Sequence, residues 1–532
     1  MIQAGELKRK AGTILALLRR YVASEQSMIA ETCLAALLYL LHLDVACVVV
    51  FVYIIALKLM ISEDSLTAFL PFLLLGMFAL RQYDSYETFM SLKFVMGAPA
   101  VIGVLFHFIY YRRKPERQGL FVGYLVLSVA LALGGLFSIS AADYFTGTSI
   151  YYTYGLGFGM LLVYAFLRPR LRSREYDIRE YVAKTAFYCA VFAIYMVASY
   201  YIGNYELIMS GKTVVIEGSG ERISAFANMM NSISNNLSTV VLLTMPFVFY
   251  SARRRGLIGG VYFAVAVLSG VAAVLTLSRG GMMFASAMCV CLIVRTLVRY
   301  REVRLRNTVI LGVILALVGV IFGVFRETFF TLFGEGVVTS SLGTKIGLIA
   351  VTLLFAAFAN YISYLFRCGS RRAILLHVAA VAALGVVLLI VCIVKWDAVS
   401  AFVVKLDYFR GNMMKIAAEN FRVYPFFGTG MGYKGLQGIY SHKTGMFGCY
   451  HCLPVQIIGS LGLVGLAAYL FMFRTRVRVL RAAPDREYST VVFLSYLGIL
   501  YMSLVNPGIF CPLIYGVQLI IYFISAEKCD DA

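Results

Sequence analysis

The chain is a succession of apolar runs, and the breaks between them alternate between strongly basic and nearly uncharged. Most runs approach the ~20 apolar residues that a membrane-spanning helix needs. The basic breaks are 112–114, 168–179, 253–255, 295–306, 367–372 and 474–486, and the breaks with few cations are 140–149, 204–236, 326–345 and 395–452. Because short cationic loops stay in the cytoplasm, the alternation predicts the orientation of the spans as well as their number.

The composition indicates the same class of protein. Hydrophobic residues make up 61% of the chain and charged residues 14%, whereas soluble proteins carry about 25% charged residues. In a soluble protein a net charge of +20 would suggest a nucleic-acid partner. Here the cations lie in short breaks between apolar runs, where anionic lipid headgroups are the simpler partner. We therefore expect contact with membrane lipids and no nucleic-acid partner.

The pattern of runs predicts an all-α, polytopic integral membrane protein with about 14 to 16 transmembrane helices. Beyond the first part of the chain, spans are expected to start near Phe89, Gly119, Ile150, Tyr181, Asn236, Leu257, Gly281, Thr308, Ile346, Ala373, Leu453, Ser489 and Gly508. Residues 28–180 would form N-terminal transmembrane helices. Residues 181–532 would form a transmembrane core with large outer loops at 204–235 and 396–452.

The start of the chain allows two interpretations. Residues 28–41 and 44–60 can form a tight hairpin followed by a span at 66–80, or residues 34–60 can form one long helix. The long helix would place the cations at 8–10 on the outer side of the membrane, whereas the hairpin keeps every basic break inside. We therefore favour the hairpin, which places both termini in the cytoplasm.

Residues 1–27 form a basic segment ahead of the first span. Their apolar part, 7–21, is a short amphipathic stretch, and no small-residue cleavage site of a secretory signal peptide follows it. We expect this segment to lie on the inner membrane surface.

The outer loop 396–452 contains a helix-like stretch at 403–421. The apolar residues that recur there at helical spacing are Leu406, Phe409, Met413, Ile416 and Ala417. Pro425 and then Gly428, Gly430 and Gly432 interrupt the pattern. This order predicts an amphipathic helix on the outer face of the bundle, followed by a glycine-rich turn.

Arg279 lies between two apolar runs at a break that is expected to face outward. An arginine at a membrane boundary costs free energy unless it reaches the headgroups or meets an anion. Its planar set of donors suits phosphate and diphosphate, and the helix that starts beside Gly280 and Gly281 offers free backbone amides to an anion. Arg279 is thus a candidate anion-binding residue, and contact with lipid headgroups is the alternative.

Two other outer arginines are candidates with simpler alternatives. Arg222 opens a stretch that continues with Asn228, Asn231 and Asn235 into the next span, and such amides need partners inside a membrane. The alternative is an ordinary capped helix start. Arg410 lies within the predicted amphipathic helix, where it can simply cover the polar face.

His451 is one of five histidines and lies at the expected outer entrance of the span that begins at Leu453. A histidine near its ordinary pKa can deprotonate or orient a hydroxyl group. The alternative is a solvated interfacial histidine. His442, nearby in the same loop, is a weaker candidate.

The eleven cysteines lie mostly inside apolar runs, where they behave as small hydrophobic residues. Cys449 and Cys452 have the spacing of redox and zinc sites, but no second cluster of Cys or His accompanies them to complete a zinc site. We expect no metal, and a disulfide between Cys449 and Cys452 on the outer face stays open.

Four stretches of this sequence resemble elements of one family, the O-antigen ligase and O-antigen polymerase superfamily of bacterial envelope glycan enzymes. The stretches are Arg-Ile-Ser-Ala-Phe-Ala-Asn at 222–228, Ser-Arg-Gly at 278–280, Arg410 with Pro-Phe-Phe-Gly-Thr-Gly at 425–430, and the helix with a trailing Gly-Leu-Val-Gly that follows His451. The similarity covers about residues 180–525. Two departures are Cys452, where the family has asparagine after the histidine, and Met230-Asn231, where it has Pro-Asn.

The resemblance implies a glycosyltransferase of the bacterial cytoplasmic membrane that uses neither a metal nor another cofactor. It would transfer a glycan from an undecaprenyl-diphosphate-linked donor to the hydroxyl of a glycan or lipid-glycan acceptor on the outer face. Arg222, Arg279 and Arg410 would bind the diphosphate, His451 would act on the acceptor hydroxyl, and Gly428, Gly430 and Gly432 would be the hinge of the covering loop. Whether the product is a polymer or a ligated glycan stays open.

A transporter or flippase of a lipid-linked sugar is the main alternative to an enzyme. Transporters also carry interior arginines, but they favour broken helices near the membrane midplane. The residues singled out here lie at one membrane face, which favours an enzyme that acts there. A non-catalytic subunit of an envelope complex is a third possibility, which would tolerate changes in all four stretches.

Overall fold

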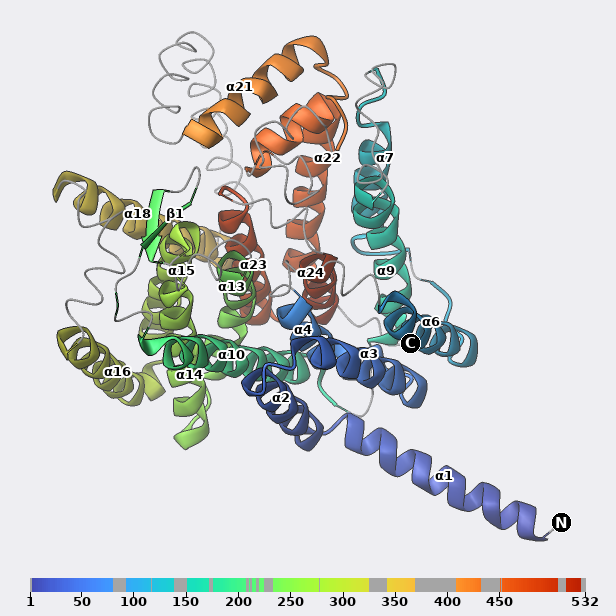
Figure 1. Cartoon of the computed structure of the whole chain (residues 1–532). Helices are drawn as coiled ribbons and strands as arrows, with labels where there is room; N and C mark the ends of the chain where they lie inside the picture. The colour runs from blue at the N-terminus through green and yellow to red at the C-terminus, as the bar shows by residue number, and fades with distance from the viewer. Residues whose placement is uncertain are drawn as a thin grey trace. The chain divides into compact units, whose positions relative to one another are not determined.

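The protein is an all-α polytopic membrane protein, seen in a computed structural model (Figure 1). The described residues are 2–79, 92–115, 117–137, 151–171, 176–206, 210, 213–216, 220–223, 233–276, 278–324, 342–368, 408–431, 450, 452–505 and 513–527. The strands among them are β1 (Thr213–Ile216) and β2 (Gly220–Ile223), which pair with each other within the predicted outer loop 204–235.

The chain forms two compact units that alternate along the sequence. Unit 1 comprises 1–115, 166–214 and 221–352, and unit 2 comprises 116–165, 215–220 and 353–532. The division of the sequence at residue 180 stays a prediction.

Unit 1 contains most of the helices of the first two thirds of the chain. They are α1 (Ile2–Val22), α2 (Glu25–Leu40), α3 (Asp44–Ile61), η1 (Ser65–Ala68), α4 (Phe69–Ala79), α6 (Lys93–Tyr110), η4 (Arg168–Arg170), α10 (Ile178–Gly203), α13 (Ile233–Ser251), α14 (Gly256–Leu275), α15 (Arg279–Arg299), η5 (Arg301–Val303) and α16 (Arg304–Val324). α18 (Leu342–Cys368) contributes residues to both units.

Unit 2 contains the remaining helices. They are α7 (Phe121–Leu133), the π-helix η3 (Tyr151–Gly159), α9 (Met160–Leu167, which ends in unit 1), α21 (Tyr408–Val423), α22 (Leu453–Ala482), α23 (Arg486–Met502) and α24 (Leu513–Ala526). The guanidinium of Arg476 in α22 lies 4.7 Å from the ring centre of Tyr496 and 5.8 Å from that of Tyr124. Cation–π contacts of this kind join α22 to α23 and α7.

Eight helices of the described chain are long and apolar enough to span a membrane, and four shorter apolar helices accompany them. Each predicted span overlaps a helix of the structure, apart from the span that starts near Ala373, which lies outside the described residues. The apolar runs form helices because lipid offers no hydrogen-bond partners, so a backbone that crosses the membrane must satisfy its N–H and C=O groups internally.

The hairpin interpretation of the first spans is confirmed. α2 ends at Leu40 and α3 begins at Asp44, so residues 34–60 do not form one helix. His42 adopts a left-handed conformation with φ of 55°, which reverses the chain between the two helices. A contact between Glu31 of α2 and Lys58 of α3 requires the helices to run antiparallel.

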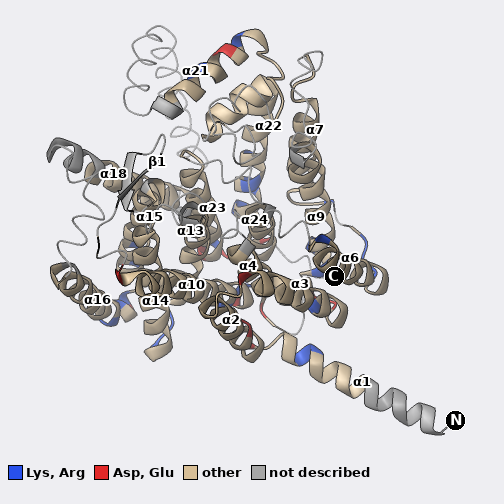
Figure 2. Ribbon diagram, in the orientation of Figure 1, with Lys and Arg blue, Asp and Glu red and all other residues tan. Residues whose placement is uncertain are grey.

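Within unit 1 the basic breaks meet at one end of the helices. Arg306 donates to the carbonyls of Arg254 and Ala252 at 2.7 Å each, and Arg254 approaches Glu180 at 3.4 Å. In Figure 2 lysine and arginine gather near the ends of α14 and α16. The breaks with few cations meet elsewhere, because Tyr201 donates to the Leu275 carbonyl at 2.8 Å. The predicted alternation of the breaks therefore corresponds to opposite ends of these helices.

The amphipathic helix predicted at 403–421 is present as α21. Its residues Met413 and Ala417 are buried and pack against Tyr450, with Ile416 and Val455 partly buried around them. The first part of the predicted stretch, including Leu406, lies outside the described residues. The helical spacing of the apolar residues thus located a packed face, as expected for an amphipathic helix.

Candidate functional site

Arg279 is the first residue of α15, at the junction that follows α14. Ser278 caps the helix, and its Oγ accepts a hydrogen bond from the Gly281 amide at 3.2 Å. Ser238 of α13 lies so close to Gly281 that a side chain there would collide with its Oγ. The structure thus places the Ser-Arg-Gly element on a helix start that is fixed by a cap and by close packing against α13.

The other predicted diphosphate-binding residues lie on separate elements. Arg222 belongs to β2 in unit 1, and Arg410 belongs to the first turn of α21 in unit 2. His451 and Gly432 lie outside the described residues. The joint action of these residues stays a prediction.

Gly428 and Gly430 both adopt left-handed conformations, with φ of 61° and 86°. Their segment is bound to α22 through its backbone: Thr429 donates to the Gly459 carbonyl at 3.2 Å and Gly430 to the Ser460 carbonyl at 2.8 Å. A side chain at Gly428 would clash with the backbone of Ser460 and Leu461. Only glycine fits this close approach. The role of these glycines as a hinge stays a prediction.

α22 is broken at the point where this segment meets it. Gly462 has non-helical backbone angles, φ 61° and ψ −152°, inside the helix. The amides released by the break donate back to the same segment, Leu463 to the Pro425 carbonyl at 2.9 Å and Val464 to the Phe426 carbonyl at 3.0 Å. We call residues 425–430 together with the break at 459–464 the clasp. The clasp satisfies the backbone groups that a break leaves without helical partners.

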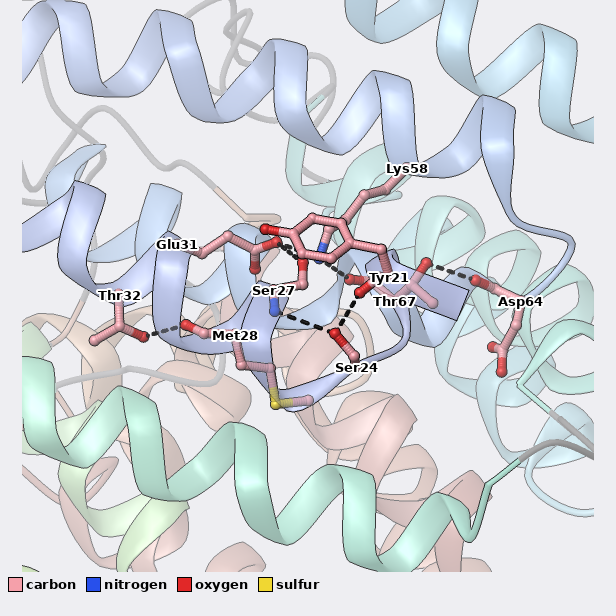
Figure 3. Close-up of polar contacts among 9 residues, drawn as sticks. All are labelled: Tyr21, Ser24, Ser27, Met28, Glu31, Thr32, Lys58, Asp64 and Thr67. Atoms are coloured by element: carbon pink, nitrogen blue, oxygen red, sulfur yellow. Dashed lines mark hydrogen bonds and ion pairs between the residues drawn. The ribbon is translucent and has the colours of Figure 1, made fainter. Parts of the chain in front are cut away.

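A buried ion pair between Glu31 and Lys58 was missed by the sequence analysis (Figure 3). Glu31 is 5% exposed and Lys58 4%, and the Lys58 ammonium contacts Glu31 Oε1. Ser27 Oγ donates to the same carboxylate oxygen at 2.8 Å. The Lys58 Nζ also donates to the Thr67 carbonyl at 3.0 Å. α3 is long and apolar enough to span a membrane, and a buried charge pair on such a helix is a candidate functional site.

The Thr67 carbonyl is available to Lys58 because of the sequence that follows it. In a continuous helix this carbonyl would accept from the amide four residues later, but that residue is Pro71, which has no N–H. The ammonium of Lys58 takes the place of the missing donor. A signal for this pair was therefore present in the sequence: one acidic and one basic residue in facing runs of a hairpin, and a proline that frees a carbonyl.

Among the described residues of α2 and α10, three buried polar atoms have no hydrogen-bond partner. They are Glu31 Oε2, Tyr181 Oη and Thr185 Oγ1. Tyr181 and Thr185 lie one turn apart on α10, and Glu31 and Asp64 both act electrostatically on Tyr181. Tyr181 thus lies within electrostatic reach of the pair, and Glu31 keeps one buried carboxylate oxygen that no described donor satisfies.

A second ionic cluster joins α2 to α10 at the basic end of unit 1. Glu25 accepts from Lys184 at 2.7 Å and from Tyr188 at 3.0 Å. Burial alone would raise the pKa of the Glu25 carboxyl, but these hydrogen bonds and the charges of Lys184 and Arg254 hold that pKa below its usual value. Glu25 is therefore ionised at neutral pH and binds the start of α2 to α10.

No group of three or more His, Cys, Asp or Glu side chains suited to a metal occurs among the described residues. Cys449 lies outside them, so a bond to Cys452 stays open. The chain matches no protein-family model, and neither a curated protein nor a solved structure is found to be similar to it. The family resemblance rests on the four sequence stretches alone.

Proposed function

We propose that the protein is a membrane glycosyltransferase that moves a glycan from an undecaprenyl-diphosphate-linked donor to an acceptor hydroxyl. The observation that carries the proposal is the place of Arg279. It is the first residue of a capped helix whose first turn is packed against α13, so the family-like Ser-Arg-Gly element stands at a fixed helix start. A diphosphate leaving group needs fixed positive charge where its own charge develops.

The proposed reaction breaks the bond between the anomeric carbon and the diphosphate oxygen while the acceptor oxygen bonds to that carbon. His451 takes the proton of the acceptor hydroxyl, and Arg279 with Arg222 and Arg410 stabilises the departing diphosphate. This assignment of roles rests on the resemblance to O-antigen ligases and polymerases. It requires no metal ion.

The location of the site follows from the charge pattern. We propose that the end of unit 1 that carries the basic breaks faces the cytoplasm of a bacterial cell and that Arg279 faces outward. Both termini would then be cytoplasmic. Labelling of single cysteines with a membrane-impermeant reagent in intact cells tests this orientation. A cysteine at residue 210 should react, one at residue 254 should not, and the reverse pattern would overturn it.

The experiment that tests the function uses the purified protein in lipid with an undecaprenyl-diphosphate oligosaccharide. Released undecaprenyl diphosphate and the glycan products are followed together. Release with a ladder of products identifies a polymerase, and release with one product only after an acceptor is added identifies a ligase. In His451→Ala we expect transfer to fall by about a hundredfold or more while donor binding is retained. Folded protein that binds donor and releases nothing would contradict the proposal.

A transporter or flippase of the same lipid-linked sugar is the second candidate, and the break in α22 favours it. Discontinuous helices with irregular backbone at membrane depth are typical of transporter binding sites. In this chain two carbonyls and two amides at the break, those of Gly459, Ser460, Leu463 and Val464, are bonded to residues 425–430 and are therefore taken up by the protein itself. Movement of donor between leaflets without release of undecaprenyl diphosphate would support the transporter.

A further inference from the structure

We propose that Gln456 is a positioning residue for His451: its side chain fixes the backbone on one side of the histidine, and its own backbone fixes the chain on the other. The inference rests on the proposed function, in which His451 takes the proton of the acceptor hydroxyl. His451 itself lies outside the described residues, and the geometry comes from its two chain neighbours, Tyr450 and Cys452.

Gln456 is the fourth residue of α22, and its side chain is completely buried. A buried amide costs free energy unless its polar atoms find hydrogen-bond partners. Both ends of this amide have one: Nε2 donates to Ser460 Oγ at 2.8 Å, and Oε1 accepts from the Tyr450 backbone amide at 2.8 Å. Because a backbone N–H needs an acceptor, the oxygen end of the side chain must face Tyr450.

The two chain neighbours of His451 are both bonded to Gln456. The Tyr450 amide donates to the side-chain oxygen, and the backbone amide of Gln456 donates to the Cys452 carbonyl at 2.8 Å. The backbone on each side of the histidine is therefore bonded to one residue of α22. A general base must meet its proton within hydrogen-bond distance, so a fixed backbone at this point contributes to the rate of transfer.

Tyr450 is also anchored independently of Gln456. Its Oη accepts a hydrogen bond from Asn420 Nδ2 at 2.8 Å, and the residue packs against Met413 and Ala417 of α21. Loss of the bond to Gln456 therefore frees the backbone of Tyr450 while its side chain stays in place.

The same amide joins the two ends of the stretch 432–449. Nε2 of Gln456 also donates to Met431 Sδ at 3.7 Å. Met431 is the residue before this stretch, and Tyr450 is the residue after it. Thr429 adds a bond close by, from its Oγ1 to the Gly459 carbonyl at 3.2 Å. Gln456 thus ties both ends of the proposed covering loop to α22, beside the clasp.

The test compares two substitutions of Gln456 in the full-length protein in lipid, with an undecaprenyl-diphosphate oligosaccharide as donor. Gln456→Met has a similar length but offers no acceptor, so kcat for release of undecaprenyl diphosphate should fall about tenfold or more while KM for the donor changes by less than about twofold. Gln456→Glu keeps an oxygen for the Tyr450 amide and should retain a rate within about threefold of wild type.

A double variant separates positioning from a purely structural role. In the His451→Ala background, Gln456→Met should cause no further loss, because the residue that it positions is gone. A structural role would lower both rates by the same factor. Gln518→Met in α24 is the matched control, since Gln518 is an equally buried glutamine whose Nε2 donates to Tyr522 Oη at 2.7 Å. It should leave the rate unchanged.

Hydrogen exchange gives a measurement that does not depend on activity. The Tyr450 amide should exchange about tenfold faster or more in Gln456→Met than in wild type, whereas the amides of α21 should not change. Wild type that releases no undecaprenyl diphosphate would overturn the proposed function and this inference with it. With active wild type, three results would overturn this inference alone: Gln456→Met at the wild-type rate, an equal loss with and without His451, or unchanged exchange at Tyr450.

Discussion

At the scale of single residues, two buried charges, Glu31 and Lys58, face each other between α2 and α3. Removal of both charged side chains from water is costly, and the Coulomb attraction repays it only when further hydrogen bonds complete the pair. Here Ser27 and the Thr67 carbonyl supply those bonds, the latter because Pro71 has no amide hydrogen. One carboxylate oxygen nevertheless has no partner.

This arrangement predicts how the pair contributes to stability. Lys58→Met should lower the free energy of unfolding by about 3–5 kcal/mol, because it leaves the Glu31 charge buried without a partner. The double variant with Glu31→Gln should recover most of the loss, since no charge is then buried. Thermal unfolding of the purified protein in detergent measures both. A double variant less stable than Lys58→Met would contradict this role of the pair.

At the scale of elements, the clasp shows how a loop and a broken helix depend on each other. Gly428 and Gly462 are both left-handed, and backbone hydrogen bonds run in both directions between 425–430 and 459–464. The sequence predicted the glycine-rich turn but not the break, because Gly459-Ser-Leu-Gly-Leu-Val-Gly465 lies in a continuous apolar run whose periodicity fits a helix. The carbonyls and amides that compensate for the break come from residues that are distant in the sequence.

The clasp predicts an asymmetric response to added methyl groups. Gly428→Ala should destabilise the protein by at least about 1–3 kcal/mol, because alanine is strained at this φ and clashes with α22. Gly97→Ala in α6 is the matched control, since a side chain there meets no atom within 4 Å and alanine suits a helix better. Equal melting temperatures for the two variants would refute the tight contact.

The contact between α2 and α10 predicts a pH dependence. The pKa of Glu25 is held below its usual value, so its contribution to stability is present above the pKa of the unfolded state and is lost as the pH falls through the folded-state pKa. Glu25→Gln should cost less than about 1 kcal/mol at neutral pH, because the pair is partly exposed, and should reduce the loss of stability on acidification. Unfolding curves from neutral to acidic pH measure this, with the exposed Glu206→Gln as control. An unchanged acid response in Glu25→Gln would contradict it.

At the scale of the whole molecule, hydropathy and charge were sufficient for the class of fold. The hairpin of α2 and α3 followed from the single requirement that the cations at 8–10 share a side with the other basic breaks, and the structure confirms two helices there. The register of the buried pair was harder to predict, because Glu31 and Lys58 lie in two separate runs and meet only once α2 and α3 pack against each other. The candidate site at Arg279 is likewise defined by the sequence, and the structure adds its cap and its close neighbour Ser238.

We propose glycosyl transfer that depends on Arg279, and a single rate measurement can test this. Release of undecaprenyl diphosphate from a lipid-linked oligosaccharide is followed for wild type, Arg279→Ala and Arg299→Ala, which removes an arginine from the opposite end of the same helix. We predict a loss of about a hundredfold or more in Arg279→Ala, the magnitude of losing one fixed donor to a developing negative charge, and a rate near that of wild type in Arg299→Ala. Folded Arg279→Ala that releases the diphosphate as fast as wild type would show that Arg279 has no part in the transfer.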